Sequence, residues 1–303
     1  MRGVFIDAND SLAEIFERQR KADDIAVKVH LDPDIKPEDW PAVLDGAAIG
    51  IVDHTALPTE IARQCKGLKH VVFLGTGARS YMNPDELAEL GITVHLIKGY
   101  GDTAVAEAAI ALMWASARGL AQMDREMRAG NWLRDDGLQL TGKTLGLIGF
   151  GGIAAEVARI AGGSGMRVIA WNRTQKTYPG VEFVPLEQLL ADSHVVSLHL
   201  LLNDETRGFL SRQRIALLRP GVILVNTARG AVVDETAMIE ALQSGHIRHA
   251  GLDVYNIEPL PADHPLTKLP NVTLSAHSAF RTPEASENLI HAALEHCRRI
   301  AKG

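Results

Sequence analysis

The chain has 303 residues, of which 46% are apolar and 22% are charged, and its formal net charge is −6. This composition is typical of a globular protein and excludes a disordered chain, and the length favours two domains because single cores stop growing near this size. The negative charge, without any block of Lys or Arg, argues against nucleic acid or a membrane surface as a partner. Residues 1–8 predict a strand rather than a leader, so we expect a cytoplasmic protein.

The two cysteines, Cys65 and Cys297, lie far apart in the sequence and match no metal-binding spacing. We therefore expect reduced, structural thiols and no metal site. No internal repeat or low-complexity tract interrupts the chain.

Short β-branched runs alternate with helix-like segments from end to end, which predicts an α/β protein with parallel sheets covered on both faces. In the first hundred residues the apolar runs lie about twenty residues apart, which leaves room for a helix between strands. These runs are 4–6, 25–29, 48–52, 70–74 and 92–96. They predict a small doubly wound domain with five strands.

A long helix is expected next, from Thr103 to Arg128, with Asp102 as its N-cap and Gly130 at its end. Its length suggests a bridge between two domains. Further apolar runs follow at 145–148, 168–171, 195–200, 222–225, 250–254 and 272–274. Six such strands suit a dinucleotide-binding sheet.

The last segment, residues 283–300, has helical spacing and no following strand, so we expect it to return to the first domain. The predicted architecture is therefore two doubly wound parallel-sheet domains. A Rossmann dinucleotide-binding domain, residues 99–279, is inserted into a smaller flavodoxin-like substrate domain made of residues 1–98 and 280–303. We expect the active site in the cleft between them.

A glycine-rich loop follows the apolar run 145–148 and precedes a helix-like segment. Its members are Gly149, Phe150, Gly151, Gly152, Ile153 and Ala154, in a Gly-x-Gly-x-x-Ala pattern. The first glycine permits a tight turn, the second lets the backbone approach a pyrophosphate, and the helix N–H groups face the anion. A strand before the loop and a helix after it make dinucleotide binding the preferred interpretation.

The end of the following strand normally carries an acidic residue that binds the ribose hydroxyls of the cofactor. Asn172, Arg173 and Thr174 stand there instead. The missing carboxylate removes repulsion against a 2′-phosphate, and the cation and hydroxyl could bind one, so we expect NADP(H) to be preferred with NAD(H) possible. The alternative is a solvated surface turn.

Arg229, Glu258 and His277 stand at the ends of later predicted strands, where open α/β sheets form their ligand crevice. A guanidinium can hold a substrate carboxylate through two parallel hydrogen bonds. Imidazole exchanges a proton near neutral pH, and a glutamate that accepts from its other nitrogen favours the charged ring. Each residue taken singly is compatible with an ordinary surface or core position.

Five blocks of sequence together resemble the D-isomer-specific 2-hydroxyacid dehydrogenase family. They are Gly149-Phe-Gly-Gly-Ile, residues 196–208, Asn226-Thr-Ala-Arg-Gly, Gly251-Leu-Asp-Val and Glu258-Pro-Leu-Pro. The resemblance covers nearly the whole chain and implies that Arg229, Glu258 and His277 are catalytic. It also implies a substrate-binding loop, Leu74, Gly75, Thr76 and Gly77, and further cofactor contacts at Thr103, His199, Leu200, Thr206, Thr227, Ala228, Arg229, Asp253 and His277.

The resemblance predicts hydride transfer between the nicotinamide and C2 of a small 2-oxo or 2-hydroxy acid. His277 is expected to exchange the proton, paired with Glu258, while Arg229 and the Gly75–Gly77 loop bind the carboxylate. A homodimer formed through residues 103–128 is also implied. Two alternatives stay open, namely a dinucleotide-sensing corepressor-like binding protein and an enzyme that oxidises an inorganic oxyanion such as phosphite.

Overall fold

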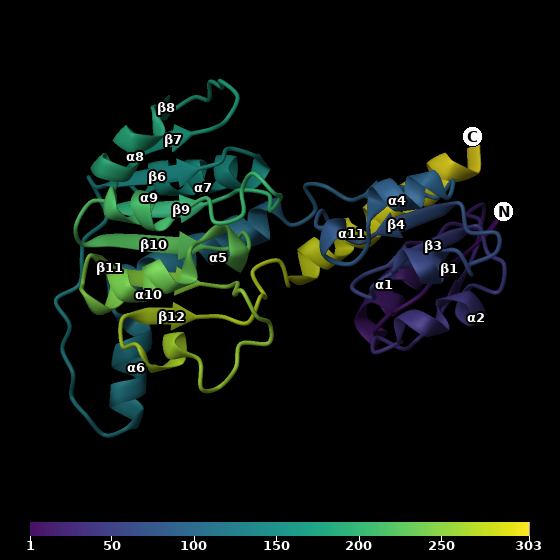
Figure 1. Cartoon of the computed structure of the whole chain (residues 1–303), viewed down its shortest axis with the longest axis horizontal. Helices are drawn as coiled ribbons and strands as arrows, with labels where there is room; N and C mark the ends of the chain where they lie inside the picture. Colours follow the sequence, from purple (N-terminus) through teal and green to yellow (C-terminus); the bar gives the residue numbers. More distant parts are fainter. Residues whose placement is uncertain (303) are drawn as a thin grey trace. The chain divides into compact units, whose positions relative to one another are not determined.

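The computed structural model describes residues 1–302, which form two compact α/β units (Figure 1). The first unit contains residues 1–101 and the C-terminal segment from Arg281 onward, and the second contains residues 102–280. The first boundary was expected after residue 98 and lies after residue 101. The second was expected before residue 280 and lies before residue 281.

The first unit is built on a parallel sheet of five strands in the order β2-β1-β3-β4-β5. Each strand overlaps one of the five predicted apolar runs. The strands are β1 (Arg2–Phe5), β2 (Ala26–Val29), β3 (Ile49–Val52), β4 (His70–Phe73) and β5 (Thr93–Leu96). The order reverses between β1 and β3, which is the flavodoxin-like form of the doubly wound fold. The predicted fold class of this part of the chain is confirmed.

Helices cover both faces of this sheet. One layer consists of α1 (Asp10–Gln19) and α11 (Pro283–Lys302), and the other of α2 (Trp40–Leu44), α3 (Thr59–Ala62) and α4 (Pro84–Glu89), with the short η1 (Pro37–Asp39) and η2 (Ala78–Ser80). Asn9 begins α1 by accepting the N–H of Leu12, as expected of an N-cap. Both cysteines are buried and free, Cys65 in one layer and Cys297 in the other.

The second unit has a parallel sheet of seven strands in the order β12-β11-β10-β9-β6-β7-β8. Their bounds are β6 (Thr144–Ile148), β7 (Arg167–Trp171), β8 (Val181–Phe183), β9 (Val195–Leu198), β10 (Val222–Asn226), β11 (Ile247–Leu252) and β12 (Val272–Leu274). Counted within the unit, this is the Rossmann order 3-2-1-4-5-6 with one further strand. The six expected strands are present, and a seventh that was not expected is β8, a three-residue edge strand with exposed Glu182 at its centre.

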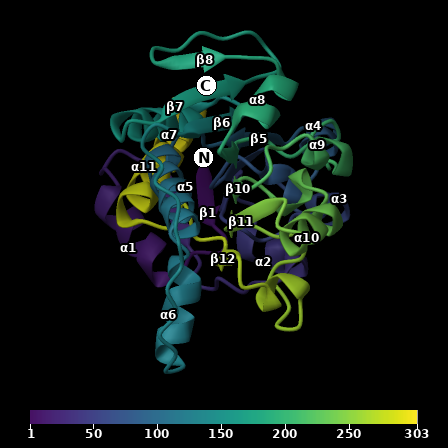
Figure 2. The ribbon, with the colours of Figure 1, turned by 90° about the vertical axis from the view of Figure 1, so that its left-hand side faces the viewer.

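Helices α5 (Asp102–Ala117) and α7 (Gly152–Gly163) pack on one face of this sheet, and α8 (Leu186–Asp192), α9 (Arg212–Ala216) and α10 (Glu235–Gln243) on the other (Figure 2). Two short turns, η3 (Gly230–Val232) and η4 (Pro265–Lys268), complete the unit. Strands β6, β9 and β10 are buried throughout, as expected of central parallel strands covered on both sides.

The expected single helix over 103–128 is wrong. It is two helices, α5 and α6 (Leu120–Arg128), bent by 65° at Gly119, whose φ is 60°. Asp102 is the first helical residue rather than the N-cap, while Gly130, with φ 86°, follows the end of α6. Within residues 1–302 no single helix has the length and apolar composition to cross a membrane, although α5 and α6 taken together as a bent pair do.

Candidate active site at the carboxyl edge of the second sheet

Three neighbouring strands of the second sheet end at the same edge, and each is followed by one predicted catalytic residue. Arg229 follows β10, Glu258 follows β11 and His277 follows β12. Because parallel strands all point the same way, these loops lie side by side at the carboxyl edge, where open α/β sheets bind ligands. The sheet therefore brings together residues that are 48 positions apart between Arg229 and His277.

His277 and Glu258 form a direct pair. Nδ1 of His277 lies 2.6 Å from Oε2 of Glu258, and Oε1 of the same carboxylate accepts the backbone N–H of Tyr255 at 2.8 Å. Both side chains are one-third exposed, at 33% each. One carboxylate oxygen thus orients the glutamate and the other orients the imidazole, and Nε2 of His277 makes no hydrogen bond within residues 1–302. That nitrogen is available for proton exchange.

The backbone of His277 adopts a left-handed conformation with φ 47°, which is uncommon for a residue other than glycine. Its N–H donates to the Asp253 carbonyl at 2.8 Å. The Asp253 side chain, only 1% exposed, accepts from the Ser275 hydroxyl at 2.5 Å and from the N–H groups of Ser278 and Ala279 at 3.0 Å each. Asp253 therefore holds both sides of the loop that carries the histidine.

Tyr255 is a supporting residue that sequence reasoning missed. Its hydroxyl lies 3.0 Å from the Leu252 carbonyl and 2.7 Å from the Ser275 carbonyl, so it links the ends of β11 and β12. Burial raises the pKa of this phenol, which keeps it protonated as a hydrogen-bond donor. The only sequence signal was its place two residues after Asp253.

Arg229 lies on a loop whose backbone is held by the side chain of Asn226. The Asn226 side chain accepts the N–H of Ala228 at 3.0 Å and donates to the Arg229 carbonyl at 3.0 Å. The guanidinium donates to the Ala228 carbonyl at 2.6 Å, and it forms no ion pair with any carboxylate in the described part of the chain. A half-buried arginine without a counter-charge is suited to bind an anionic ligand.

The glycine-rich loop forms the turn between β6 and α7. Gly149 has φ 85°, a conformation that favours glycine, and a Cβ there would lie 2.6 Å from the His199 carbonyl oxygen. Gly151 is the N-cap of α7, which begins at Gly152, so Ile153 lies in the first helical turn. The Phe150 N–H donates to the Asn172 side chain at 3.0 Å, which joins this loop to the end of β7.

These residues fit a dinucleotide. The hydroxyl of Thr227 is buried and has no hydrogen-bond partner among residues 1–302, so it is free to bond to a ligand or a water molecule. The first turn of α7 presents backbone N–H groups without helical partners beside an open position at Gly151. Among the same described residues, no group of three His, Cys, Asp or Glu side chains is placed to hold a metal ion.

The other predicted cofactor residues are placed as follows. Burial lowers the pKa of His199 to about 4, so the ring is neutral, and its Nε2 lies 2.9 Å from the Ser197 hydroxyl. Leu200 is half-buried, Thr206 is tied to the Leu201 carbonyl at 2.5 Å, and Thr103 is exposed on the first turn of α5. Ala228 lies beside Arg229 on the loop after β10.

The cation expected to bind a 2′-phosphate, Arg173, has a counter-charge in the structure. Its guanidinium forms an ion pair with Glu205, while the Asn172 amide donates to the carbonyl and hydroxyl of Thr174 at 2.8 and 3.0 Å. The turn after β7 is therefore held by hydrogen bonds within it and by an ion pair with the loop after β9.

The predicted substrate loop, Leu74–Gly77, belongs to the first unit and directly follows β4. Leu74 donates its N–H to the Val52 carbonyl at 2.8 Å, whereas the N–H groups of Thr76 and Gly77 make no hydrogen bond within the described residues. Successive free N–H groups at a strand end can form an anion-binding concavity.

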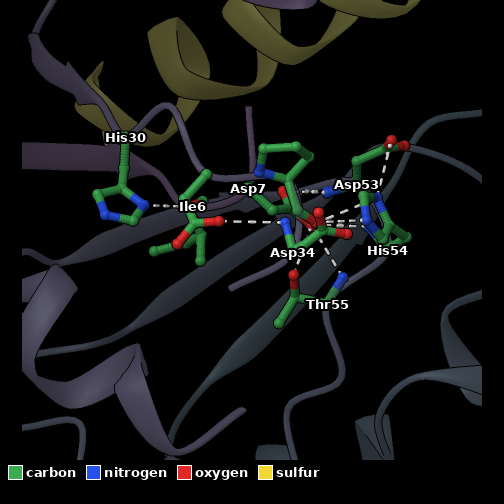
Figure 3. Close-up of polar contacts among 9 residues, drawn as sticks. Ile6, Asp7, His30, Asp34, Asp53, His54 and Thr55 are labelled. Atoms are coloured by element: carbon green, nitrogen blue, oxygen red, sulfur yellow. Dashed lines mark hydrogen bonds and ion pairs between the residues drawn. The ribbon is translucent and has the colours of Figure 1, made fainter. Parts of the chain in front are cut away.

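A buried aspartate organises the neighbouring loop at the same edge of the first sheet (Figure 3). Asp7, fully buried, accepts the N–H groups of Asp53, His54 and Thr55 at 2.8, 2.9 and 2.8 Å, and the Thr55 hydroxyl at 2.9 Å. The His54 ring lies between Asp53 Oδ2, 3.2 Å from Nδ1, and the Pro33 carbonyl, 2.7 Å from Nε2. None of these residues belongs to a motif that the sequence predicts.

The second unit matches the family model described as the NAD-binding domain of D-isomer specific 2-hydroxyacid dehydrogenases, over residues 110–279. That match covers more than half of the chain. The chain therefore belongs to the D-isomer-specific 2-hydroxyacid dehydrogenases, a family of nicotinamide-dependent oxidoreductases.

Relatives within this family carry several names. The D-3-phosphoglycerate dehydrogenase of Archaeoglobus fulgidus is 36% identical to this chain. The matched region covers 84% of this chain and 50% of that protein. The glyoxylate reductase of Aeropyrum pernix is 40% identical over 71% of this chain and 68% of its own length. A structure described as an acyclic imino acid reductase in complex with NADPH and D-Arg matches with a TM-score of 0.87 and 29% identity, covering 100% of this chain and 97% of that one.

Proposed function

We propose that this chain is a reductase of small 2-oxo acids that interconverts them with D-2-hydroxy acids and prefers NADPH to NADH. One observation carries the proposal: the 2.6 Å pair of His277 and Glu258 stands at the same sheet edge as the unpaired Arg229. When bound, the nicotinamide supplies or accepts the hydride at C2 of the substrate.

Residues of the chain bind the substrate and transfer the proton. Arg229 binds the substrate carboxylate through two parallel hydrogen bonds. In the first unit, the free N–H groups of Thr76 and Gly77 form an anion-binding turn. His277, through Nε2, gives a proton to the oxygen that develops on C2 during reduction and takes it back during oxidation. Glu258 orients the ring through its hydrogen bond with Nδ1.

The dinucleotide is held by the second unit in this proposal, and the first unit serves as the substrate domain. The glycine loop binds the pyrophosphate, and Thr227 supplies a hydroxyl that has no partner within the described residues. The other proposed contacts are Thr103, Phe150, Ile153, Asn172, Arg173, Thr174, His199, Leu200, Thr206, Ala228, Arg229, Asp253 and His277. Asn172 in place of an acid supports the preference for NADPH, as does the imino acid reductase observed with NADPH.

Steady-state assays with glyoxylate, hydroxypyruvate, longer 2-oxo acids and phosphite, each with both cofactors, test the function. Turnover of a 2-oxo acid with a higher kcat/KM for NADPH than for NADH is the expected result. Turnover of phosphite alone would favour an oxyanion oxidase, and cofactor binding without turnover of any substrate would favour a dinucleotide-sensing protein. A parent enzyme that prefers NADH would contradict the cofactor part of the proposal.

We also propose a cytoplasmic homodimer assembled through α5 and α6. The supporting observation is a row of large apolar side chains in and after α6, with Leu120, Met127 and Trp132 being 51%, 50% and 74% exposed. Both views show α6 extending past β12 (Figures 1 and 2). Light scattering of the parent and of a Met127→Lys, Trp132→Ser variant tests this, and a monomeric parent would exclude it.

A further inference from the structure

Two cations lie near the end of β7, and only one of them has a counter-charge. Arg173 forms an ion pair with Glu205 from the loop after β9, and the two side chains are 75% and 70% exposed. A carboxylate in this position competes with any anionic ligand for the guanidinium. The net charge that Arg173 contributes to the cofactor site is therefore close to zero.

Lys176, three residues further along, is differently placed. Its ammonium donates to the Phe150 carbonyl at 2.6 Å, and it forms no ion pair anywhere in residues 1–302. A carbonyl satisfies one of the three ammonium N–H groups and leaves two for a ligand. The uncompensated positive charge of this turn thus lies on Lys176.

The lysine is fixed against the nucleotide-binding loop itself. The Phe150 N–H donates to Asn172 and its carbonyl accepts from Lys176, so the residue between the two loop glycines is held from both sides by the turn after β7. Ring contacts of Phe150 with Tyr178, at 5.2 Å between centroids, and with Phe183, at 5.1 Å, add to this attachment. The glycine loop and the 172–178 segment form one packed assembly.

We propose that Lys176, rather than Arg173, is the cation that selects the 2′-phosphate of the cofactor, and that Glu205 limits this selection by occupying Arg173. The inference rests on the proposed NADPH preference and deepens it. In this fold the residue at the end of the second strand meets the 2′ position of the adenosine ribose. That residue is Asn172, and Lys176 contacts the same loop residue as Asn172 does.

Binding of 2′,5′-ADP and of 5′-AMP, measured by calorimetry, isolates the 2′-phosphate from catalysis. In Lys176→Met we expect 2′,5′-ADP to bind about 10- to 100-fold more weakly, as for loss of a charged hydrogen bond, while 5′-AMP changes less than about twofold. Lys176→Arg, which keeps the charge, should restore most of the discrimination. Lys268→Met is the matched control, because Lys268 also donates to a backbone carbonyl, Ala262, at 3.3 Å, but far from the loop.

Two further variants test the part played by the ion pair. Arg173→Ala should lower 2′,5′-ADP affinity less than Lys176→Met does, because its charge is already balanced. Glu205→Gln should raise that affinity about two- to fivefold, in line with the small free energy of an exposed ion pair. An Arg173→Ala loss as large as that of Lys176→Met would overturn the assignment.

The outcomes separate this inference from the proposed function. A parent protein that binds 2′,5′-ADP no better than 5′-AMP refutes the NADPH preference itself. A parent that discriminates, with a Lys176→Met variant that discriminates equally, overturns only the assignment to Lys176. Equal loss of both ligands in Lys176→Met would mean that the lysine positions the loop or binds the 5′-phosphate, and would also overturn the assignment.

Discussion

Asp253 holds His277 in two ways: its backbone carbonyl bonds to the histidine itself, and its buried carboxylate bonds to the two residues that follow the histidine. The Asp253 carbonyl accepts the His277 N–H at 2.8 Å, and its carboxylate oxygens accept the N–H groups of Ser278 and Ala279 at 3.0 Å each. A left-handed backbone at a residue other than glycine costs roughly 1–2 kcal/mol, and these hydrogen bonds offset that cost. The position of the proposed acid–base residue therefore depends on an aspartate that need not take part in proton transfer.

Asp253→Asn should lower kcat at least about tenfold and reduce the free energy of unfolding by about 1–3 kcal/mol, because an amide cannot accept hydrogen bonds at both positions. Ser275→Ala is the matched control, since it removes a single hydrogen bond to the same carboxylate. Thermal unfolding, cofactor affinity and kcat would be measured for both. A variant that loses cofactor affinity but keeps kcat and stability would assign Asp253 to cofactor binding alone.

His277→Gln should lower kcat by roughly 10²–10⁴, the usual contribution of a positioned acid–base group. Glu258→Gln should lower kcat by less than that, because it weakens the orientation of the imidazole without removing the ring. Since residues that act as a unit are not additive, the double variant should be no slower than His277→Gln alone. Additive losses in kcat would show that the 2.6 Å pair is not a functional unit.

Arg229→Lys retains the positive charge but cannot form two parallel hydrogen bonds with a carboxylate. We expect kcat/KM for the 2-oxo acid to fall about 10- to 100-fold, while the dissociation constant of the cofactor changes less than about threefold. Fluorescence titration of the cofactor and initial rates against substrate concentration would separate the two. Unchanged kcat/KM would remove Arg229 from the substrate site.

Much of the framework follows from local pattern. The apolar runs that become β6, β9 and β10 are buried on both faces, so their hydrophobicity is continuous and visible in the sequence. The glycine loop is equally local, because a turn with positive φ at Gly149 needs that residue type. Because the strands are parallel, the loops that follow them lie at one edge of the sheet, and this was enough to predict that Arg229, Glu258 and His277 share that edge.

The features that the sequence did not predict depend on contacts between distant segments. Arg173 and Glu205 are 32 positions apart, and only the packed structure pairs them. Asp7 holds residues 53–55 across 46 to 48 positions, from the end of β1 to the end of β3. The bend at Gly119 was missed because glycine is tolerated inside helices, so the residue alone does not predict a break.

The final prediction concerns pH and the His54 ring shown in Figure 3. Its two nitrogens face a carboxylate oxygen of Asp53 and the carbonyl of Pro33, and both are acceptors, so only the protonated ring satisfies both. The hydrogen bond to Asp53, opposed by burial and helped by the charge of Asp7, raises the pKa of His54 to about 9.

Because the folded-state pKa lies above the ordinary value of 6.5, the stabilisation from His54 is fully present below pH 6.5 and is lost as pH rises toward 9. At 1.36 kcal/mol per pKa unit the full effect is at most roughly 3 kcal/mol, and since the ring is 46% exposed we expect about 1 kcal/mol. The difference in unfolding free energy between the parent and His54→Asn should therefore shrink from pH 6 to pH 9.5. His30→Asn, which removes a ring bound to the Ile6 carbonyl at the same edge, serves as the control. A difference that stays constant over this range would show that His54 contributes by packing rather than by charge.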